Sequence, residues 1–295
     1  MRQLERLGIG GIVDLERTGP GGYLGRCHSG KVRTRGYGGA VLAHALAAAA
    51  DTVEPGRGPH SLHGYFLAAV DPATPIAFGA VPLRQGRSYS VVRVDAAQGA
   101  RPVFTMTASF KRPEPGAHRR HAALPAGIAG PEDAPDGFAS HDPDSPMTRV
   151  LEYRDAGPLP SALPGEIARA GWFRCRDDLG PGAVAQACGL AYLSDVSLSP
   201  TAFGRLGGYA RPEGAVLASL DHAMWFHGDG RDLRAHEWLL FVQRSRIEAD
   251  GRTFGRGELW TRDGVLAASV AQEALIRIPD AGRPVPAAAA ENQRS

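Results

Sequence analysis

Lysine and cysteine are both scarce in this 295-residue sequence, and each scarcity narrows what the protein can be. Lys31 and Lys111 are the only lysines, so arginine carries almost all of the positive charge, and the net charge is only +2. A chain so close to neutral gives no reason to expect nucleic acid as a partner. The three cysteines, Cys27, Cys175 and Cys188, form neither a CxxC pair nor an even set. We therefore expect reduced thiols and no disulfide framework.

The sequence also lacks a segment that would direct the chain into a membrane. Its first residues are charged and do not resemble a secretory signal. The most apolar stretch, residues 41–53, contains His44 and Asp51 and is too short to span a bilayer. We expect a soluble, cytoplasmic protein without membrane insertion.

Signatures of several enzyme classes are missing as well. No Gly-x-Ser-x-Gly motif marks a nucleophilic serine, which disfavours an α/β-hydrolase. The glycine cluster at residues 19–22 lacks the strand and helix that flank a dinucleotide site. His118 and His121 have no further metal ligands nearby in the sequence. We expect no cofactor and no metal ion.

Two stretches of the sequence repeat the same order of elements. In the first, residues 38–53 have the pattern of a helix that is apolar on nearly all sides, and strands are predicted over 61–67, 88–96 and 102–110. In the second, a helix is predicted over 181–193, and strands over 216–227, 237–247, 254–261 and 265–276. Residues 103–110 align with residues 265–272 without a gap. Gln98-Gly99 and Asp263-Gly264 are predicted hairpin turns.

This repeat predicts an α+β fold of two similar halves. A helix that is apolar on all sides must be buried, so each half is expected to wrap an antiparallel sheet around its own helix. Joining the two sheets edge to edge would also remove two exposed edges. The predicted boundaries are a first half over 1–115, a linker over 116–146, a second half over 147–280 and a disordered tail over 281–295, with a turn or small insertion at 228–231.

Several motifs resemble the acyl-CoA thioesterase II family. In the first half they are Tyr37-Gly-Gly39, His60-Ser-Leu-His-Gly-Tyr-Phe-Leu67 and Met106-Thr-Ala-Ser-Phe110. In the second half they are Leu220-Asp-His-Ala-Met-Trp-Phe-His227, Glu237-Trp-Leu-Leu240, Arg256-Gly-Glu258 and the run from Asp263 to Glu273. The resemblance extends from about Gly25 to Ile278 and implies a double hotdog fold and hydrolysis of acyl-CoA thioesters. It also implies an Asp, a Ser or Thr and a Gln that hold the attacking water, and in this sequence these roles fall on Asp221, Ser245 and Gln272.

The residues themselves give partial support to this assignment. Strict strand alternation puts Gln272, Asp221 and Ser245 on mostly apolar faces of three strands, where an unpaired polar group is costly. Taken singly, each has an ordinary structural explanation: a satisfied amide, a bracing Asp and a small residue in a crowded sheet. The combination of the three favours a site. A thioester carbonyl is electrophilic enough for direct attack by water, so no nucleophilic serine is needed.

The developing oxyanion would need donors, and free N–H groups at a helix start can supply them. Gly38 and Gly39 are the first candidates and Gly182 the second.

Three functions remain open from the sequence. The first is a thioesterase acting on acyl-CoA or on an acyl-carrier protein. The second is another hotdog enzyme, such as an enoyl-thioester hydratase, and the third is a non-catalytic acyl-CoA binder. The Asp, Ser and Gln set favours hydrolysis of acyl-CoA. The resemblance also implies a homo-oligomer, a dimer or larger.

Overall fold

The computed structural model describes residues 6–30, 34–114, 122–139, 144–160, 163–206, 212–228 and 233–278. Seven strands and one long helix come from the first part of the chain. They are β1 (Arg6–Ile9), β2 (Val13–Gly19), β3 (Gly22–Gly25), α1 (Gly38–Asp51), β4 (Gly58–Phe66), β5 (Ile76–Gln85), β6 (Tyr89–Gln98) and β7 (Arg101–Lys111).

The second part of the chain repeats this composition with additional short helices. Its elements are α2 (Pro146–Val150), β8 (Leu151–Pro158), β9 (Ile167–Cys175), α3 (Ala183–Ser194), the 3-10 helix η1 (Ser199–Leu206), β10 (Val216–Ser219), β11 (Asp221–Phe226), β12 (Leu239–Ala249), β13 (Arg252–Thr261) and β14 (Leu266–Arg277).

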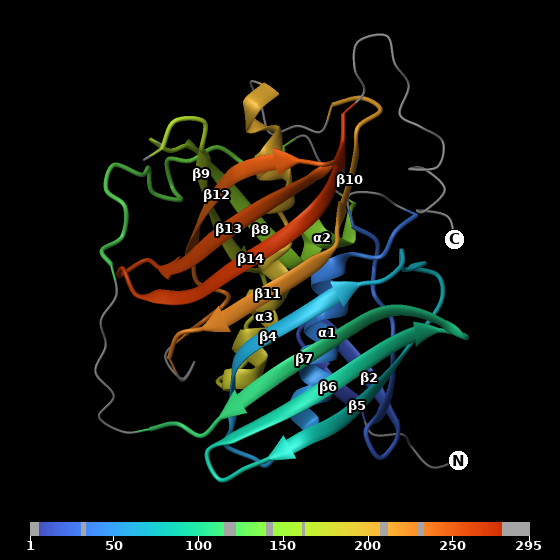
Figure 1. The fold of residues 1–295 in the computed structure, drawn as a ribbon. Coiled ribbons are helices and arrows are strands. Elements are labelled where there is room, and N and C mark those ends of the chain that lie inside the picture. Colours follow the sequence, from blue (N-terminus) through green and yellow to red (C-terminus); the bar gives the residue numbers. More distant parts are fainter. Residues whose placement is uncertain are drawn as a thin grey trace.

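The strands of the described residues form one continuous antiparallel sheet (Figure 1). Their order is β1-β2-β3-β5-β6-β7-β4-β11-β14-β13-β12-β9-β8, with β10 paired to β14. The order is symmetrical about the β4–β11 pair, because β4-β7-β6-β5 runs one way and β11-β14-β13-β12 the other. The aligned residues 103–110 and 265–272 thus lie on equivalent strands, β7 and β14. The predicted α+β double hotdog fold, with its sheets joined edge to edge, is confirmed.

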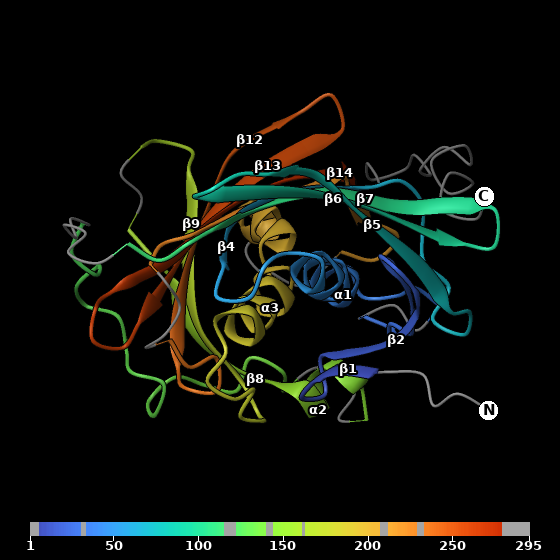
Figure 2. The ribbon, with the colours of Figure 1, turned by 90° about the horizontal axis from the view of Figure 1, so that it is seen from below.

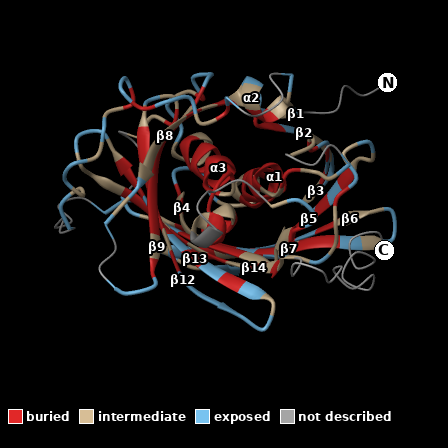
Figure 3. Ribbon diagram, turned by 90° about the horizontal axis from the view of Figure 1, so that it is seen from above, coloured by how far each residue is buried: buried red, intermediate tan, exposed pale blue. Residues whose placement is uncertain are grey.

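The two long helices lie inside the curve of this sheet and pack against each other (Figure 2). Residues 39–49 of α1 are all buried, as an all-apolar helix requires (Figure 3). The helices run antiparallel: the start of α1 meets the end of α3, where Tyr37 Oη donates to Tyr192 O at 2.6 Å. A Cβ on Gly39 would collide with the same carbonyl, so this close approach requires glycine.

The longer described part of the predicted linker, residues 122–139, packs onto the second half of the sheet. It contains no helix or strand, apart from a single bridge between Asp136 and Arg154. Trp172 Nε1 donates to Ala129 O at 2.8 Å, and Leu124, Ile128 and Ala134 pack with Trp172, Leu240, Val242 and Trp260. This segment covers apolar residues of β9, β12 and β13 on the outer face of the sheet. The predicted tail over 281–295 lies outside the described residues, as do residues 229–231 of the predicted insertion.

The structure also contains elements that the sequence reading did not include. These are the strands β1, β2, β3, β5, β8 and β9 and the short helices α2 and η1. The strand predicted over 216–227 is interrupted at Leu220, which separates β10 from β11. That interruption changes which side chains of this segment face the helices.

Candidate active site

Gln272 lies at the centre of a buried hydrogen-bond network on the helix-facing side of β14. Its Nε2 lies 2.6 Å from Asp195 Oδ1, 3.0 Å from Ser219 Oγ and 3.1 Å from His222 Nδ1. Its Oε1 accepts a hydrogen bond from Ser199 Oγ at 2.6 Å. Both ends of the amide are therefore satisfied, and this fixes which end faces Asp195.

Asp195 brings a carboxylate to the meeting point of the two helices. It is the C-cap of α3, and its side chain is only 7% exposed. Ser219 Oγ donates to Asp195 Oδ1 at 3.4 Å. Asp195 Oδ2 lies 2.7 Å from the position that a Cβ on Gly38 would take, at the start of α1. The carboxylate thus stands between Gln272 on the sheet and the N-terminus of α1.

His222 completes this network as a neutral ring. Burial lowers the pKa of His222 from its ordinary value of about 6.5 to about 4, so the ring is uncharged at pH 7. When Gln272 Nε2 donates to His222 Nδ1, the ring proton is on Nε2, which donates to Ser194 Oγ at 2.9 Å. His222 therefore supports Gln272 as a hydrogen-bond acceptor.

A one-residue β-bulge places Ser219 and His222 on the same face. Ser219 pairs with Ala274, and Ala223 pairs with Ala271. Three residues separate the first members of these pairs and only two separate the second, so the β10–β11 strand carries one extra residue. The extra residue shifts the alternation of side chains, and both Ser219 and His222 turn toward Gln272.

The same bulge sends Asp221 to the opposite face, away from Gln272. Asp221 Oδ2 lies 3.0 Å from Nε2 of the exposed His63, and its Oδ1 accepts the backbone N–H of Glu273 at 2.7 Å. The expectation that Asp221 and Gln272 hold one water together does not fit this geometry. The expectation came from the family resemblance, and its support from the residues assumed unbroken alternation along residues 216–227, which the bulge interrupts.

Ser245 is also separated from Gln272, although both side chains face the helices. Ser245 pairs with Gly255 on β13, and Gly255 pairs with Gln272, so the two residues stand two strands apart, about 10 Å. Leu198 packs 3.2 Å from the place of a Gly255 Cβ. Ser245 Oγ lies 3.2 Å from Thr253 Oγ1 and 3.2 Å from Phe254 O. The hydroxyl is satisfied within its own hairpin.

The two candidate helix starts differ in their relation to the network. Gly38 and Gly39 begin α1 beside Asp195. Ala40 N and Val41 N both donate to Tyr37 O, whereas the described residues offer no acceptor to the N–H of Gly38 or Gly39. Gly182 begins α3 at the end remote from Asp195, about 18 Å away along the helix. Only the first start can serve this site.

Comparisons with known proteins agree with this architecture over both halves. The model of the acyl-CoA thioesterase N-terminal domain matches residues 29–111, and the model of the acyl-CoA thioesterase C-terminal domain matches residues 129–276. Acyl-coenzyme A thioesterase 8 of Mus musculus is 32% identical over 287 residues, which cover 90% of this chain and 88% of that protein. The chain belongs to the acyl-CoA thioesterase II family.

Two further relatives extend the comparison. Acyl-CoA thioesterase 2 of Haemophilus influenzae is 31% identical over 262 residues, covering 83% of this chain and 88% of that protein. The crystal structure of an acyl-CoA thioesterase II from Mycobacterium marinum superimposes with a TM-score of 0.76 at 35% identity, covering 92% of this chain and 99% of that one. The protein is an acyl-CoA thioesterase, the first of the three functions that the sequence left open.

In this thioesterase the described residues contain no group of three or more His, Cys, Asp or Glu side chains that could hold a metal ion. Among the helices that the structure describes, none combines the length and apolar character needed to cross a membrane.

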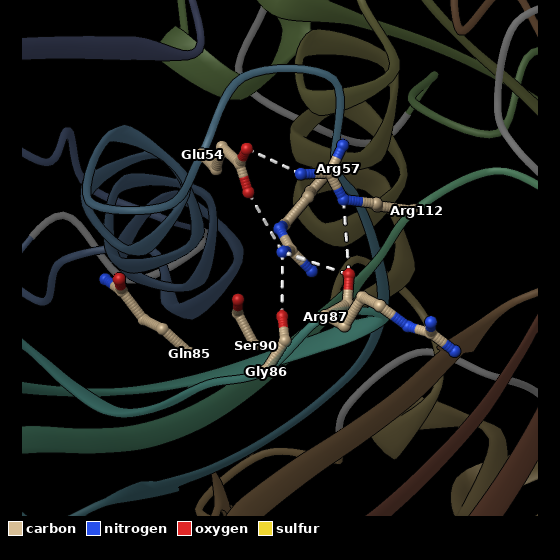
Figure 4. Close-up of a pocket in the computed structure, with 7 residues that line it drawn as sticks. All are labelled: Glu54, Arg57, Gln85, Gly86, Arg87, Ser90 and Arg112. Carbon is tan, nitrogen blue, oxygen red and sulfur yellow. Dashed lines mark hydrogen bonds and ion pairs between the residues drawn. The ribbon is translucent and has the colours of Figure 1, made fainter.

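A cavity of about 320 Å³ lies near the far end of α1 in this thioesterase, past its last residue (Figure 4). Glu54 Oε2 lies 3.0 Å from Arg57 Nη2, and Glu54 Oε1 lies 2.5 Å from Arg112 Nη2. Arg57 Nη2 also donates to Gly86 O at 2.8 Å. A carboxylate already stands between the two guanidinium groups, so the cluster clamps the end of α1 to the β5–β6 hairpin. It lies about 21 Å along α1 from Gly38.

Four residues of the network, Asp195, Ser199, Ser219 and His222, were not among the site residues predicted from the sequence. Ser219 lies two residues before Asp221, just outside the motif that carries the resemblance. Asp195 follows an apolar helix, where the negative end of the helix dipole disfavours a carboxylate. An acidic residue at such a position was the signal that the sequence offered.

Proposed function

We propose that Asp195, Ser219 and Gln272 hold the water that attacks the acyl-CoA thioester. The observation that carries the proposal is their shared network: Gln272 Nε2 contacts both partners, at 2.6 Å and 3.0 Å. Asp221 and Ser245, the residues first carried over for this role, lack that proximity. Gln272 keeps the role that the sequence suggested for it.

In this proposal Asp195 acts as the general base. The water oxygen attacks the thioester carbonyl carbon while Asp195 takes up the water's proton. The C–S bond then breaks, the carboxylic acid forms, and the CoA thiolate leaves and receives a proton. Gln272 and Ser219 fix the position of the carboxylate and of the water, which reduces the entropy lost on reaching the transition state.

The N–H groups of Gly38 and Gly39 are proposed to stabilise the oxyanion. They lie at the N-terminus of α1, next to Asp195, where the helix dipole favours negative charge. Glycine at Gly38 leaves room for a carbonyl oxygen to approach the backbone.

The test measures the turnover of variants at Asp195, Gln272 and Ser219, with Ser245 as the matched control for Ser219. We expect Asp195→Asn to lower kcat by about 100-fold or more in a free-thiol release assay across a panel of acyl-CoAs, because Asn cannot accept the proton. Gln272→Ala and Ser219→Ala should lower kcat by about 10-fold, since each positions the reacting groups.

Ser245→Ala is the control for Ser219→Ala, because it removes another buried hydroxyl from the same half. It should cost on the order of 1 kcal/mol of stability and leave kcat unchanged. Near-normal turnover in folded Asp195→Asn would refute the proposed base.

We also propose that the thioesterase assembles as a dimer or larger oligomer. Large apolar side chains are exposed on the outer face of the central strands, with Tyr65 on β4 and Trp225 on β11 each about half exposed. Such a patch on a folded surface favours a protein interface. Light scattering at micromolar concentration should give at least twice the chain mass of 31.1 kDa, and the mass of a single chain would contradict this.

The cytoplasm is the compartment we propose. Cys27, Cys175 and Cys188 are all buried and unpaired, which suits a reducing environment.

A further inference from the structure

One backbone N–H on β14 is bonded by a side chain where a regular ladder would supply a carbonyl. Glu273 N donates to Asp221 Oδ1 at 2.7 Å. The carbonyl of the same residue accepts Leu220 N–H at 2.9 Å, so both groups of Glu273 point toward the β10–β11 strand. The extra residue in the bulge moves the next backbone carbonyl out of register, and the Asp221 carboxylate takes its place.

This contact lies next to both residues whose placement the site needs. The N–H of Glu273 belongs to the peptide unit that begins at Gln272, so the bond holds the backbone from which the catalytic amide projects. Asp221 is two residues after Ser219, on the other side of the bulge. Leu220 between them is bonded in both directions, because its carbonyl also accepts Phe66 N–H at 2.9 Å on β4.

We propose that Asp221 is a positioning residue that locks the β-bulge and thereby aims Ser219 and Gln272 at one another. Without this acceptor, the N–H of Glu273 would lose a charge-assisted hydrogen bond and the pairing could slip toward the regular register. A slip of one residue turns a side chain to the other face, which would take Ser219 out of the network. The inference rests on the proposed roles of Ser219 and Gln272, and it assigns Asp221 no contact with substrate.

The required property of Asp221 is an acceptor oxygen, and its charge is secondary. Asn has the same shape and can present its Oδ1 to Glu273 N–H while donating its amide to His63. A general base must accept a proton, which Asn cannot do at neutral pH. The two roles therefore predict opposite results for one substitution.

The experiment measures kcat, KM and folded fraction for Asp221→Asn, Asp221→Ala and Asp221→Val on the same preparations. We expect Asp221→Asn to keep kcat within about threefold of the parent protein. Asp221→Ala should lower kcat by about 10-fold or more with KM changed by less than about threefold, because the site is misaligned while substrate contacts elsewhere persist. Asp221→Val also removes the acceptor but suits a strand better, so it provides the same test if the Ala variant is too unstable.

His63→Ala is the matched control. It removes the partner of Asp221 Oδ2 and leaves the bond from Glu273 to Oδ1, so kcat should stay within about twofold of the parent value.

Two results would overturn the inference. Equal, strong loss of kcat in folded Asp221→Asn and Asp221→Ala would show that the carboxylate itself performs chemistry. Normal kcat in every folded Asp221 variant would show that the bulge holds without it. Gln272→Ala, measured in parallel, separates these results from failure of the proposed site: full activity there would refute the site itself.

Discussion

At the scale of single residues, the Gln272 amide determines what its neighbours can do. Nε2 has two protons but faces three acceptors, on Asp195, Ser219 and His222. The Asp195 contact is the shortest of the three at 2.6 Å and involves a carboxylate, so it takes one proton. Ser219 and the neutral His222 share the other. Ser219 can then direct its own proton to Asp195 or to a bound water, which is the property a water-positioning hydroxyl needs.

Gln272 could be found from the sequence because its signal was local. Burying an unpaired amide in an otherwise apolar strand costs free energy, so such a residue stands out in the pattern of one strand. The gapless repeat between residues 103–110 and 265–272 identified that strand. Ser219 and Asp221 could not be distinguished in that way. Their faces depend on one extra residue in β10–β11, and no single-strand pattern marks where pairing slips. The family motif begins one residue after Ser219, and the bulge determines that Ser219, and not Asp221, faces Gln272.

At the scale of the elements, the buried helices and the central hairpins were predictable. A run of apolar residues on every side of a helix admits only a buried position, and Gly264, with φ of 85°, turns the predicted β13–β14 hairpin. Strands β1 and β5 were missed because their apolar pattern is weak. β1 has no buried residue, and β5 is mostly exposed along its second half, where Pro82 also occurs. Such strands are specified by the neighbour they pair with.

The start of α1 allows a test of how elements build the site. Gly38→Ala would place a Cβ 2.7 Å from Asp195 Oδ2 and 3.0 Å from the Phe66 ring. Alanine favours the helix, so the fold should persist while Asp195 is displaced. We expect kcat to fall by about 10-fold or more, consistent with a small misplacement of the reacting groups.

Gly182→Ala is the matched variant, at the start of α3. The atom nearest to the new Cβ would be the Cβ of Ala185 at 4.0 Å, which is an ordinary contact. We therefore expect kcat within about twofold of the parent value. Equal losses in both variants, or no loss in Gly38→Ala, would show that crowding at Asp195 does not limit turnover.

At the scale of the whole molecule, the proposed site draws on both halves, although the residues proposed to hold the water all come from the second half. Gly38 from the first half lies beside Asp195 from the second, and the Phe66 ring also approaches Gly38. The β4–β11 ladder and the α1–α3 contact hold these parts together. Covalent fusion of the halves fixes their stoichiometry, so in our proposal the second half activates the water and the first half supplies the helix start.

The stability of the whole molecule should depend on pH through buried histidines in both halves. Burial lowers the pKa of His44 on α1 and of His222 on β11 from about 6.5 to about 4. Between these values the unfolded chain binds protons that the folded chain does not, so stability is complete above about pH 6.5 and falls as the pH drops toward 4. Each histidine should cost about 2 kcal/mol by pH 5, where most carboxylates are still ionised.

We expect Tm to fall by several degrees between pH 7 and pH 5. His44→Gln should lower Tm at pH 7 but reduce that pH-dependent fall, because one of the two groups is gone. Thermal melts of both proteins across this range provide the measurement, and a Tm that stays constant from pH 7 to pH 5 would show that these rings remain accessible to protons in the folded protein.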